Sequence, residues 1–249
     1  MPETLTPSPA ELSQEEQNEA LLGQSELGVI LTDAYRTAVN LDPRLADIKI
    51  SPISDPQDHR YGYATPKWAV SNESGQHEIH VRLDDLDGTL AYYAKAMQDL
   101  PAGVDMIASR LGVEPQKVTP QLLYVQSILH EMGHLTEYMD NEGDPAALQH
   151  RVKAERAALP IGNVTAGALI TPGTKAYEFV EASWDEIQAG LGVASRDDLV
   201  ARQAREYRTM TSETIADGFA TNVFVSNPQM YDQLMQPTVD AYRNFPMAA

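Results

Sequence analysis

The sequence predicts an α+β protein that is mostly helical, with a small antiparallel or mixed sheet packed on a central helix and a helical C-terminal part. Two observations lead to this class. Apolar residues recur at helical spacing in several long segments. Alternation of apolar and polar residues, which is typical of strands, is confined to about residues 47–84. A chain of 249 residues can bury a substantial core, so we expect a single domain at 21–249 behind a flexible tail.

The predicted tail covers residues 1–20. It begins with a proline-rich stretch and continues with several glutamates, a composition that favours a mobile acidic segment. After it, apolar residues recur at helical spacing behind Ser25, which is a suitable N-cap residue. We therefore expect a core-packed helix from Ser25 to about Leu41.

Three short runs in the next region indicate strands. Ile48 and Ile50 alternate with polar neighbours, residues 67–70 form a second run, and residues 77–83 again alternate apolar and polar side chains. The last two runs are separated by Ser-Asn-Glu-Ser-Gly, which is a turn signal. We expect these runs to form a small, mainly antiparallel sheet.

Helical patterns resume after the sheet. Thr119 followed by Pro120 is a capping residue with proline at the first helical position, which predicts a helix over about 120–139. Residues 160–173 are apolar and rich in glycine, so we expect a flexible loop there. The other predicted helices cover about 89–112 with a break near Pro101, 144–159, 174–191, 195–210, 212–225 and a short segment after Asn227-Pro228.

The predicted helix at 120–139 contains the pattern His-Glu-x-x-His. His130 and His134 are four residues apart, so they project from one face of a helix and can bind one metal ion together. Glu131 follows the first histidine, which puts its carboxylate beside the metal rather than on it. A carboxylate in that position can hold and deprotonate a metal-bound water.

This motif resembles the signature of the zincin metallopeptidases. The resemblance implies a zincin-like fold and one Zn²⁺ per chain, held by His130 and His134, with Glu131 as the general base. It also implies a strand at the edge of the sheet that pairs with an extended substrate. Residues 77–83 are our candidate for that edge, and a strand that only closes the core is the alternative.

Zinc needs at least one more protein ligand while a position stays open for water. The segment that starts at Glu213 resembles the Glu-x-x-x-Asp helix of the glutamate zincins, or gluzincins. Carried over by position, Glu213 is the third ligand, and Asp217 hydrogen-bonds a ligand histidine. The small residues Ala216, Gly218 and Ala220 would let this helix approach the metal helix closely, as would Gly133. Phe219-Ala220 and Asn227-Pro228, which follow it, also resemble the ImmA/IrrE-like branch of zincins.

Two other residues compete for the third ligand position. Asp140 fits the spacing of the metzincins, although Glu137 replaces the glycine that the metzincin turn requires. Without that turn the helix continues, and Asp140 would point away from His134. His150 is the other candidate. A donor for the developing oxyanion is usual in this class, and Tyr207, Arg208 and His150 are the candidates for that role.

The net charge is −18, which disfavours nucleic acid and anionic membranes as partners. The chain has no cysteine, so cysteine-ligated zinc and disulfides are excluded. We find no secretory signal or apolar membrane span and expect a soluble, cytoplasmic protein. The predicted function is zinc-dependent hydrolysis of peptide bonds in a peptide or protein substrate. The alternative is a zinc-binding regulatory or interaction module with the same fold and no proteolytic turnover.

Overall fold

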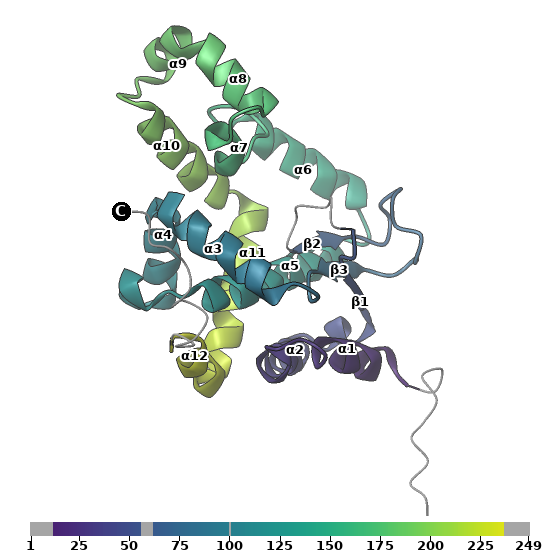
Figure 1. The fold of residues 1–249 in the computed structure, drawn as a ribbon. Helices are drawn as coiled ribbons and strands as arrows, with labels where there is room; N and C mark the ends of the chain where they lie inside the picture. The colour runs from purple at the N-terminus through teal and green to yellow at the C-terminus, as the bar shows by residue number, and fades with distance from the viewer. Residues whose placement is uncertain (1–11, 56–61, 100, 237–249) are drawn as a thin grey trace, which may run out of the picture.

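The computed structural model describes residues 12–55, 62–99 and 101–236 (Figure 1). These residues are mostly helical and include a small three-stranded sheet, which confirms the predicted α+β class. Before the sheet lie α1 (Gln14–Leu22), α2 (Gly28–Leu41) and the short 3-10 helix η2 (Pro43–Asp47). Within the described ranges, every helix is too short or too polar to span a lipid bilayer.

Helix α1 corrects the predicted extent of the N-terminal tail. It begins at Gln14 behind Ser13, whose side chain accepts a hydrogen bond from the Glu16 amide in a capping box. Asn18 of α1 is buried, and its side-chain amide donates to the carbonyl of Ile48 at 2.8 Å. The segment from 14 to 20 therefore belongs to the folded domain. The first eleven residues of the predicted tail lie outside the described residues.

The sheet consists of β1 (Lys49–Pro52), β2 (Gly62–Thr65) and β3 (Glu78–Val81) in the order β1-β3-β2. Strand β3 pairs with β1 in parallel and with β2 in antiparallel orientation, so the sheet is mixed. The expectation of an edge strand at 77–83 is wrong, because β3 lies between the other two. The predicted strand at 67–70 does not form either. Those residues form a turn instead, with Val70 fully exposed.

Helix α5 (Pro120–Asp140) is the centre of the core. Thr119 caps its start by accepting a hydrogen bond from the Leu122 amide, as the sequence predicts. Its apolar side chains are buried among α2, α3 (Leu86–Asp99), the sheet and α11 (Thr211–Ser226). The helical residues that follow α3 are those of α4 (Pro101–Leu111), and the predicted break near Pro101 falls at residue 100, outside the described residues. The 3-10 helix η3 (Pro115–Lys117) then leads into α5.

Helices α5 and α11 cross at very short distance. A Cβ atom added to Gly133 would lie 2.6 Å from the Cα atom of Ala216, closer than side chains tolerate. Ala216 and Ala220 are buried toward α5, as expected, but Gly218 is exposed on the other face of α11. The prediction that Gly218 contributes to this approach is therefore wrong. After α11, α12 (Pro228–Leu234) packs against α2 and α5.

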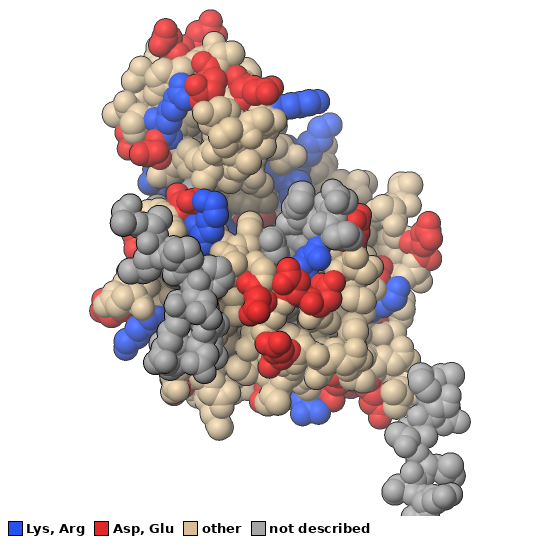
Figure 2. All heavy atoms as spheres, in the orientation of Figure 1, with Lys and Arg blue, Asp and Glu red and all other residues tan. Residues whose placement is uncertain are grey.

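The segment between α5 and α11 forms a separate helical lobe, at the top of the view in Figure 1. It comprises α6 (Pro145–Ala157), α7 (Ala166–Ile170), α8 (Lys175–Ala182), α9 (Trp184–Leu191) and α10 (Arg196–Arg208). The lobe has its own small apolar core, formed by Leu169, Val180, Ile187, Val193, Leu199 and Val200. Acidic side chains are spread over both the lobe and the body on the face shown in Figure 2, in keeping with the net charge of −18.

Two sequence predictions change within this lobe. Residues 160–173 are not a loop throughout, because they contain α7, whose N-cap Thr165 accepts from the Ala168 amide. The predicted helix at 174–191 is divided into α8 and α9 at Ser183, whose backbone leaves the helical region. The predicted helices at 144–159, 195–210 and 212–225 agree with α6, α10 and α11 to within a few residues.

Candidate active site

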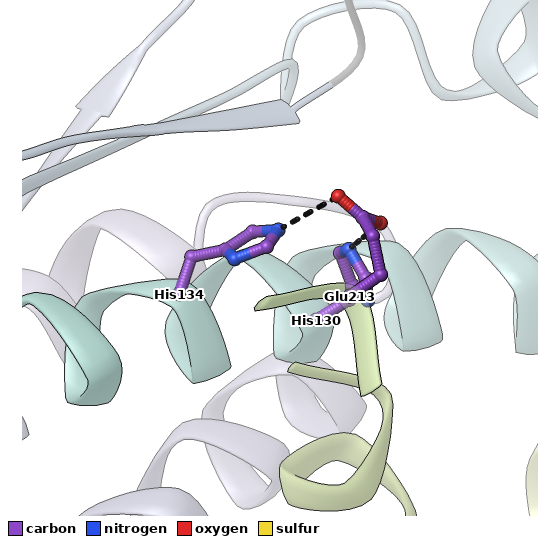
Figure 3. Close-up of side chains that lie close together, drawn as sticks. All are labelled: His130, His134 and Glu213. Carbon is purple, nitrogen blue, oxygen red and sulfur yellow. Dashed lines mark ion pairs between the residues drawn. The ribbon is translucent and has the colours of Figure 1, made fainter. Parts of the chain in front are cut away.

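Three potential metal ligands converge where α5 and α11 cross (Figure 3). His130 and His134 project from one face of α5, and Glu213 comes from the first turn of α11. The Glu213 carboxylate lies 3.2 Å from Nε2 of His130 and 3.7 Å from Nε2 of His134. The three ligand atoms all lie within 4.8 Å of one another, so this group could hold a metal ion.

The protonation states of the three side chains suit metal binding. Burial lowers the pKa of both histidines, that of His134 to about 4, so both imidazoles are neutral at pH 7. Burial opposes ionisation of Glu213. In the acid range where Glu213 titrates, however, protonated His130 donates a hydrogen bond to it, and the positive charges of both histidines and Arg208 add to this effect and lower its pKa to about 2. Neutral imidazole and ionised carboxylate are the forms that bind metals.

Asp217 lies one turn after Glu213 and holds His130 in position. Its Oδ1 atom lies 2.7 Å from Nδ1 of His130 and also accepts from Nε2 of Gln126 at 3.2 Å. Two arginines neutralise the buried Asp217 carboxylate. Nη1 of Arg208 lies 3.3 Å away, and Arg110 of α4 forms a close ion pair with the other carboxylate oxygen. The arrangement agrees with the role that the sequence resemblance implies for Asp217.

Glu131 lies beside the three ligands without belonging to them. Its Oε2 atom accepts a hydrogen bond of 2.9 Å from the backbone amide of Ala64 in β2. Burial raises the pKa of the Glu131 carboxyl to about 7, although this hydrogen bond acts in the opposite direction. The edge strand of the sheet thus contacts the candidate general base directly.

The site opens into a cleft of about 860 Å³ between the helical lobe and the body of the molecule. The body contributes residues of β2, α3, α4 and α5, and the lobe contributes residues of α6, α7 and α10. Tyr207 and Arg208 line this cleft together with Glu213, as two of the three predicted oxyanion donors should. Burial raises the pKa of Tyr207 to about 12, so its hydroxyl keeps its proton at neutral pH.

Two sequence candidates lie away from the site. Asp140 is at the exposed end of α5 and pairs with Arg44 at 2.7 Å, because the helix continues through Glu137 without a turn. His150 is exposed on α6 and does not line the cleft, so it serves neither as third ligand nor as oxyanion donor. The structure therefore leaves Glu213 as the residue that joins the two histidines.

Three features of the site were not predicted from the sequence. Arg110 and Arg156 line the cleft from α4 and α6, where their local sequence is that of ordinary exposed helix. The Ala64 amide reaches Glu131 from β2, a strand with little apolar alternation. In each case the information lies in long-range packing rather than in a local pattern.

No protein-family model, curated protein or solved structure matches this chain. Any functional conclusion therefore depends on the side chains and their geometry. The group that could hold a metal consists of two imidazoles and a carboxylate, and the half-buried carboxyl group of Glu131 and an edge strand lie next to it.

Proposed function

We propose that this protein is a zinc-dependent peptidase. The observation that carries the proposal is the position of Glu131. Its half-buried carboxyl group lies in the same cleft as His130, His134 and Glu213 yet is not one of the potential ligands. A site that only binds a metal has no use for such a group, whereas hydrolysis needs a general base beside the ion.

The donor set fits Zn²⁺. Two histidine nitrogens and one carboxylate oxygen are the ligands of many catalytic zinc sites, in which a further position stays open. The hydrogen bond between Asp217 and His130 adds the outer contact that usually orients a ligand histidine. Two histidines and a carboxylate also suit non-haem iron, but Glu131 favours hydrolytic chemistry.

In the proposed reaction, Zn²⁺ would act as a Lewis acid that activates a water molecule and polarises the carbonyl group of the peptide bond. Glu131 accepts a proton from the attacking water and delivers it to the leaving amine. A carboxyl group whose pKa is about 7 can perform both transfers near neutral pH. Tyr207 and Arg208 line the same cleft and can supply hydrogen-bond donors for the developing oxyanion.

Strand β2 supports a peptide as the substrate. It pairs with β3 on one side only and forms the cleft wall at Tyr63 and Ala64. An extended peptide can add to such an edge through main-chain hydrogen bonds. The Ala64 amide points toward Glu131, so a peptide bound along β2 would pass the general base.

The test combines metal analysis with peptide cleavage. Elemental analysis should find about one zinc per chain in wild type and in Asp140→Ala, and loss of that zinc in Glu213→Ala. Wild type should cleave members of a broad peptide library, and Glu131→Gln should keep the zinc and lose turnover. Zinc without any cleavage would favour the regulatory or interaction module instead. Wild type that binds no zinc after metal-replete preparation would rule out the proposed peptidase.

A further inference from the structure

The cleft contains an arginine without a carboxylate partner. Three arginines line it: Arg110, Arg156 and Arg208. Arg110 and Arg208 both form ion pairs with Asp217. Arg156 forms no ion pair with any residue in the described ranges, and its Nε atom is buried there without a hydrogen-bond partner.

The buried Nε atom distinguishes Arg156 from basic side chains on the surface that also form no ion pair within the described ranges, such as the exposed Lys153. Acidic residues outnumber basic residues by 36 to 18, yet no described carboxylate pairs with Arg156. A guanidinium group stays protonated and offers five N–H donors in a planar fork that matches a carboxylate. Leaving one of these donors buried and unpaired is unfavourable unless a ligand satisfies it.

The position of Arg156 points to the substrate as that ligand. It lies on α6 one turn after Val152, and both residues line the cleft from the side of the helical lobe. Its positive charge acts on Tyr138 of α5 and on Tyr207 of α10, opposing the rise in pKa that burial imposes on both phenols. Arg156 is therefore close enough to influence Tyr138 and Tyr207, which line the cleft together with the candidate metal ligands.

We propose that Arg156 binds a carboxylate group of the substrate inside the cleft. The inference rests on the proposed peptidase function, and it narrows the substrate class to peptides that carry a negative charge near the cleaved bond. That charge has two sources, the C-terminal carboxylate or the side chain of an aspartate or glutamate. The rest of the cleft wall provided by the lobe is largely apolar, with Val152, Ala166, Ile170, Val200, Ala201 and Ala204.

The experiment measures peptide binding separately from turnover. A fluorescently labelled pool of short peptides is prepared in three forms: a free C-terminal acid without acidic side chains, the same pool as a C-terminal amide, and the amide with one glutamate. Dissociation constants are measured by anisotropy on zinc-loaded Glu131→Gln protein, so that bound peptide is not cleaved. Arg156→Gln and Lys153→Gln are each added to this background. Lys153 is the matched control because it is exposed on the same helix and does not line the cleft.

We expect one carboxylate form to bind at least about tenfold more tightly than the neutral amide, because a hydrogen bond between charged groups contributes that much to affinity in proteins. The preferred form identifies the source of the carboxylate. Arg156→Gln should reduce the preference to about one, and Lys153→Gln should leave it unchanged. Unchanged zinc content and thermal midpoint of Arg156→Gln would show that the protein still folds.

The outcomes separate this inference from the proposed function. Equal affinity for the three forms, a preference that survives Arg156→Gln, or no measurable binding of any form would overturn the role of Arg156. Preferential binding of a carboxylate form by a wild-type protein that cleaves no peptide would overturn the peptidase function and leave the carboxylate site intact. Cleavage of neutral and acidic peptides at equal rates by wild type would support the peptidase function and overturn the carboxylate site.

Discussion

Oδ1 of Asp217 lies 2.7 Å from Nδ1 of His130. A carboxylate only accepts hydrogen bonds, and this contact is shorter than the 3.2 Å between Nε2 and Glu213, so the neutral imidazole carries its hydrogen on Nδ1 and leaves the Nε2 lone pair for a metal. The contact thus fixes both the tautomer and the orientation of a candidate metal ligand. The spacing of Glu213 and Asp217 on one face of α11 makes this possible, since one helix supplies a ligand and the group that orients another.

The first prediction concerns this contact. Asp217→Asn keeps the size of the side chain but replaces a charged acceptor with a neutral amide, so the orientation and basicity of His130 are no longer fixed. We expect zinc affinity to fall about 10- to 100-fold, measured by competition with a chromophoric chelator. The matched control is Asp140→Asn on the exposed end of α5. Equal affinity in the two variants would refute the assigned role of Asp217.

A second prediction concerns removal of the metal. The ligand group joins α5 to α11, so an ion bound only by the folded protein should stabilise it. Free zinc at about 1,000 times its Kd would add about 4 kcal/mol and raise the thermal midpoint by about 8 °C or more in a chain of this size. A chelator should reverse the shift, as followed by calorimetry. Glu213→Ala should show no such response, and an equal response in both proteins would contradict the assignment.

A third prediction tests the crossing of α5 and α11. Gly133→Ala would put a methyl group 2.6 Å from the backbone of Ala216, and two helix backbones cannot yield at little cost. We expect a net loss of about 1–3 kcal/mol in the free energy of unfolding, because overpacking outweighs the gain in helix propensity. Gly218→Ala on the exposed face of α11 meets no atom and should gain up to about 1 kcal/mol. Denaturant titration measures both, and equal effects would contradict the close approach.

These results indicate which parts of the site the sequence could predict. His130 and His134, and likewise Glu213 and Asp217, are each four residues apart, and helix geometry alone puts such pairs on one face. Gly133 predicts a close crossing because a residue without a side chain lets another helix approach the backbone. The sequence favours Glu213 over Asp140, because Asp140 points away from His134 when the helix continues, but it does not show which distant helix crosses α5 and brings Glu213 to the histidines. Arg110, Arg156 and the Ala64 amide were missed because they reach the cleft only through packing between separate elements.

The sheet was harder to predict than the helices. Strand β2 has the sequence Gly-Tyr-Ala-Thr and is half-buried along its length, so it carries no clear alternation. The predicted run at 67–70 looked better in sequence, but Trp68 turns inward onto His77 and Tyr138 while Val70 points to solvent. The order β1-β3-β2 depends on a parallel crossover, which short strand patterns do not encode. The composition of residues 14–20 predicts a tail, because Asn18, the residue of this stretch that is buried, is polar and gives no apolar pattern.

A fourth prediction concerns pH. The buried carboxyl of Glu78 has a pKa below its ordinary value of 4.5, because the hydrogen bonds from Ser51 and Lys49 outweigh burial. A lowered pKa in the folded state stabilises the fold above the unfolded pKa, and this contribution is lost as pH falls through the folded pKa. Glu78→Gln should therefore lower the free energy of unfolding by about 1 kcal/mol at neutral pH and by much less in acid. Glu73→Gln, on the exposed turn, is the surface control in parallel urea titrations, and a loss in Glu78→Gln that is the same at both pH values would contradict the prediction.

The last prediction tests whether α1 is part of the domain. The side chain of Asn18 donates to Tyr35 at 2.9 Å and to the Ile48 carbonyl at 2.8 Å, and it accepts from the Ile50 amide at 3.1 Å. Asn18→Ala would leave two backbone groups beside β1 buried and unpaired. We expect a loss of about 2–4 kcal/mol in the free energy of unfolding.

Gln17→Ala provides the control, because Gln17 is exposed on the same helix and its side chain donates a hydrogen bond to the Leu12 carbonyl at the surface. It should change the free energy of unfolding by less than about 0.5 kcal/mol. Zinc content should be the same in both variants, since the ligands come from α5 and α11. If Asn18→Ala were as stable as Gln17→Ala, residues 14–20 would behave as the tail that their composition indicates. A large loss in Asn18→Ala alone would instead show that α1 holds β1, and through β3 the edge strand, against α5.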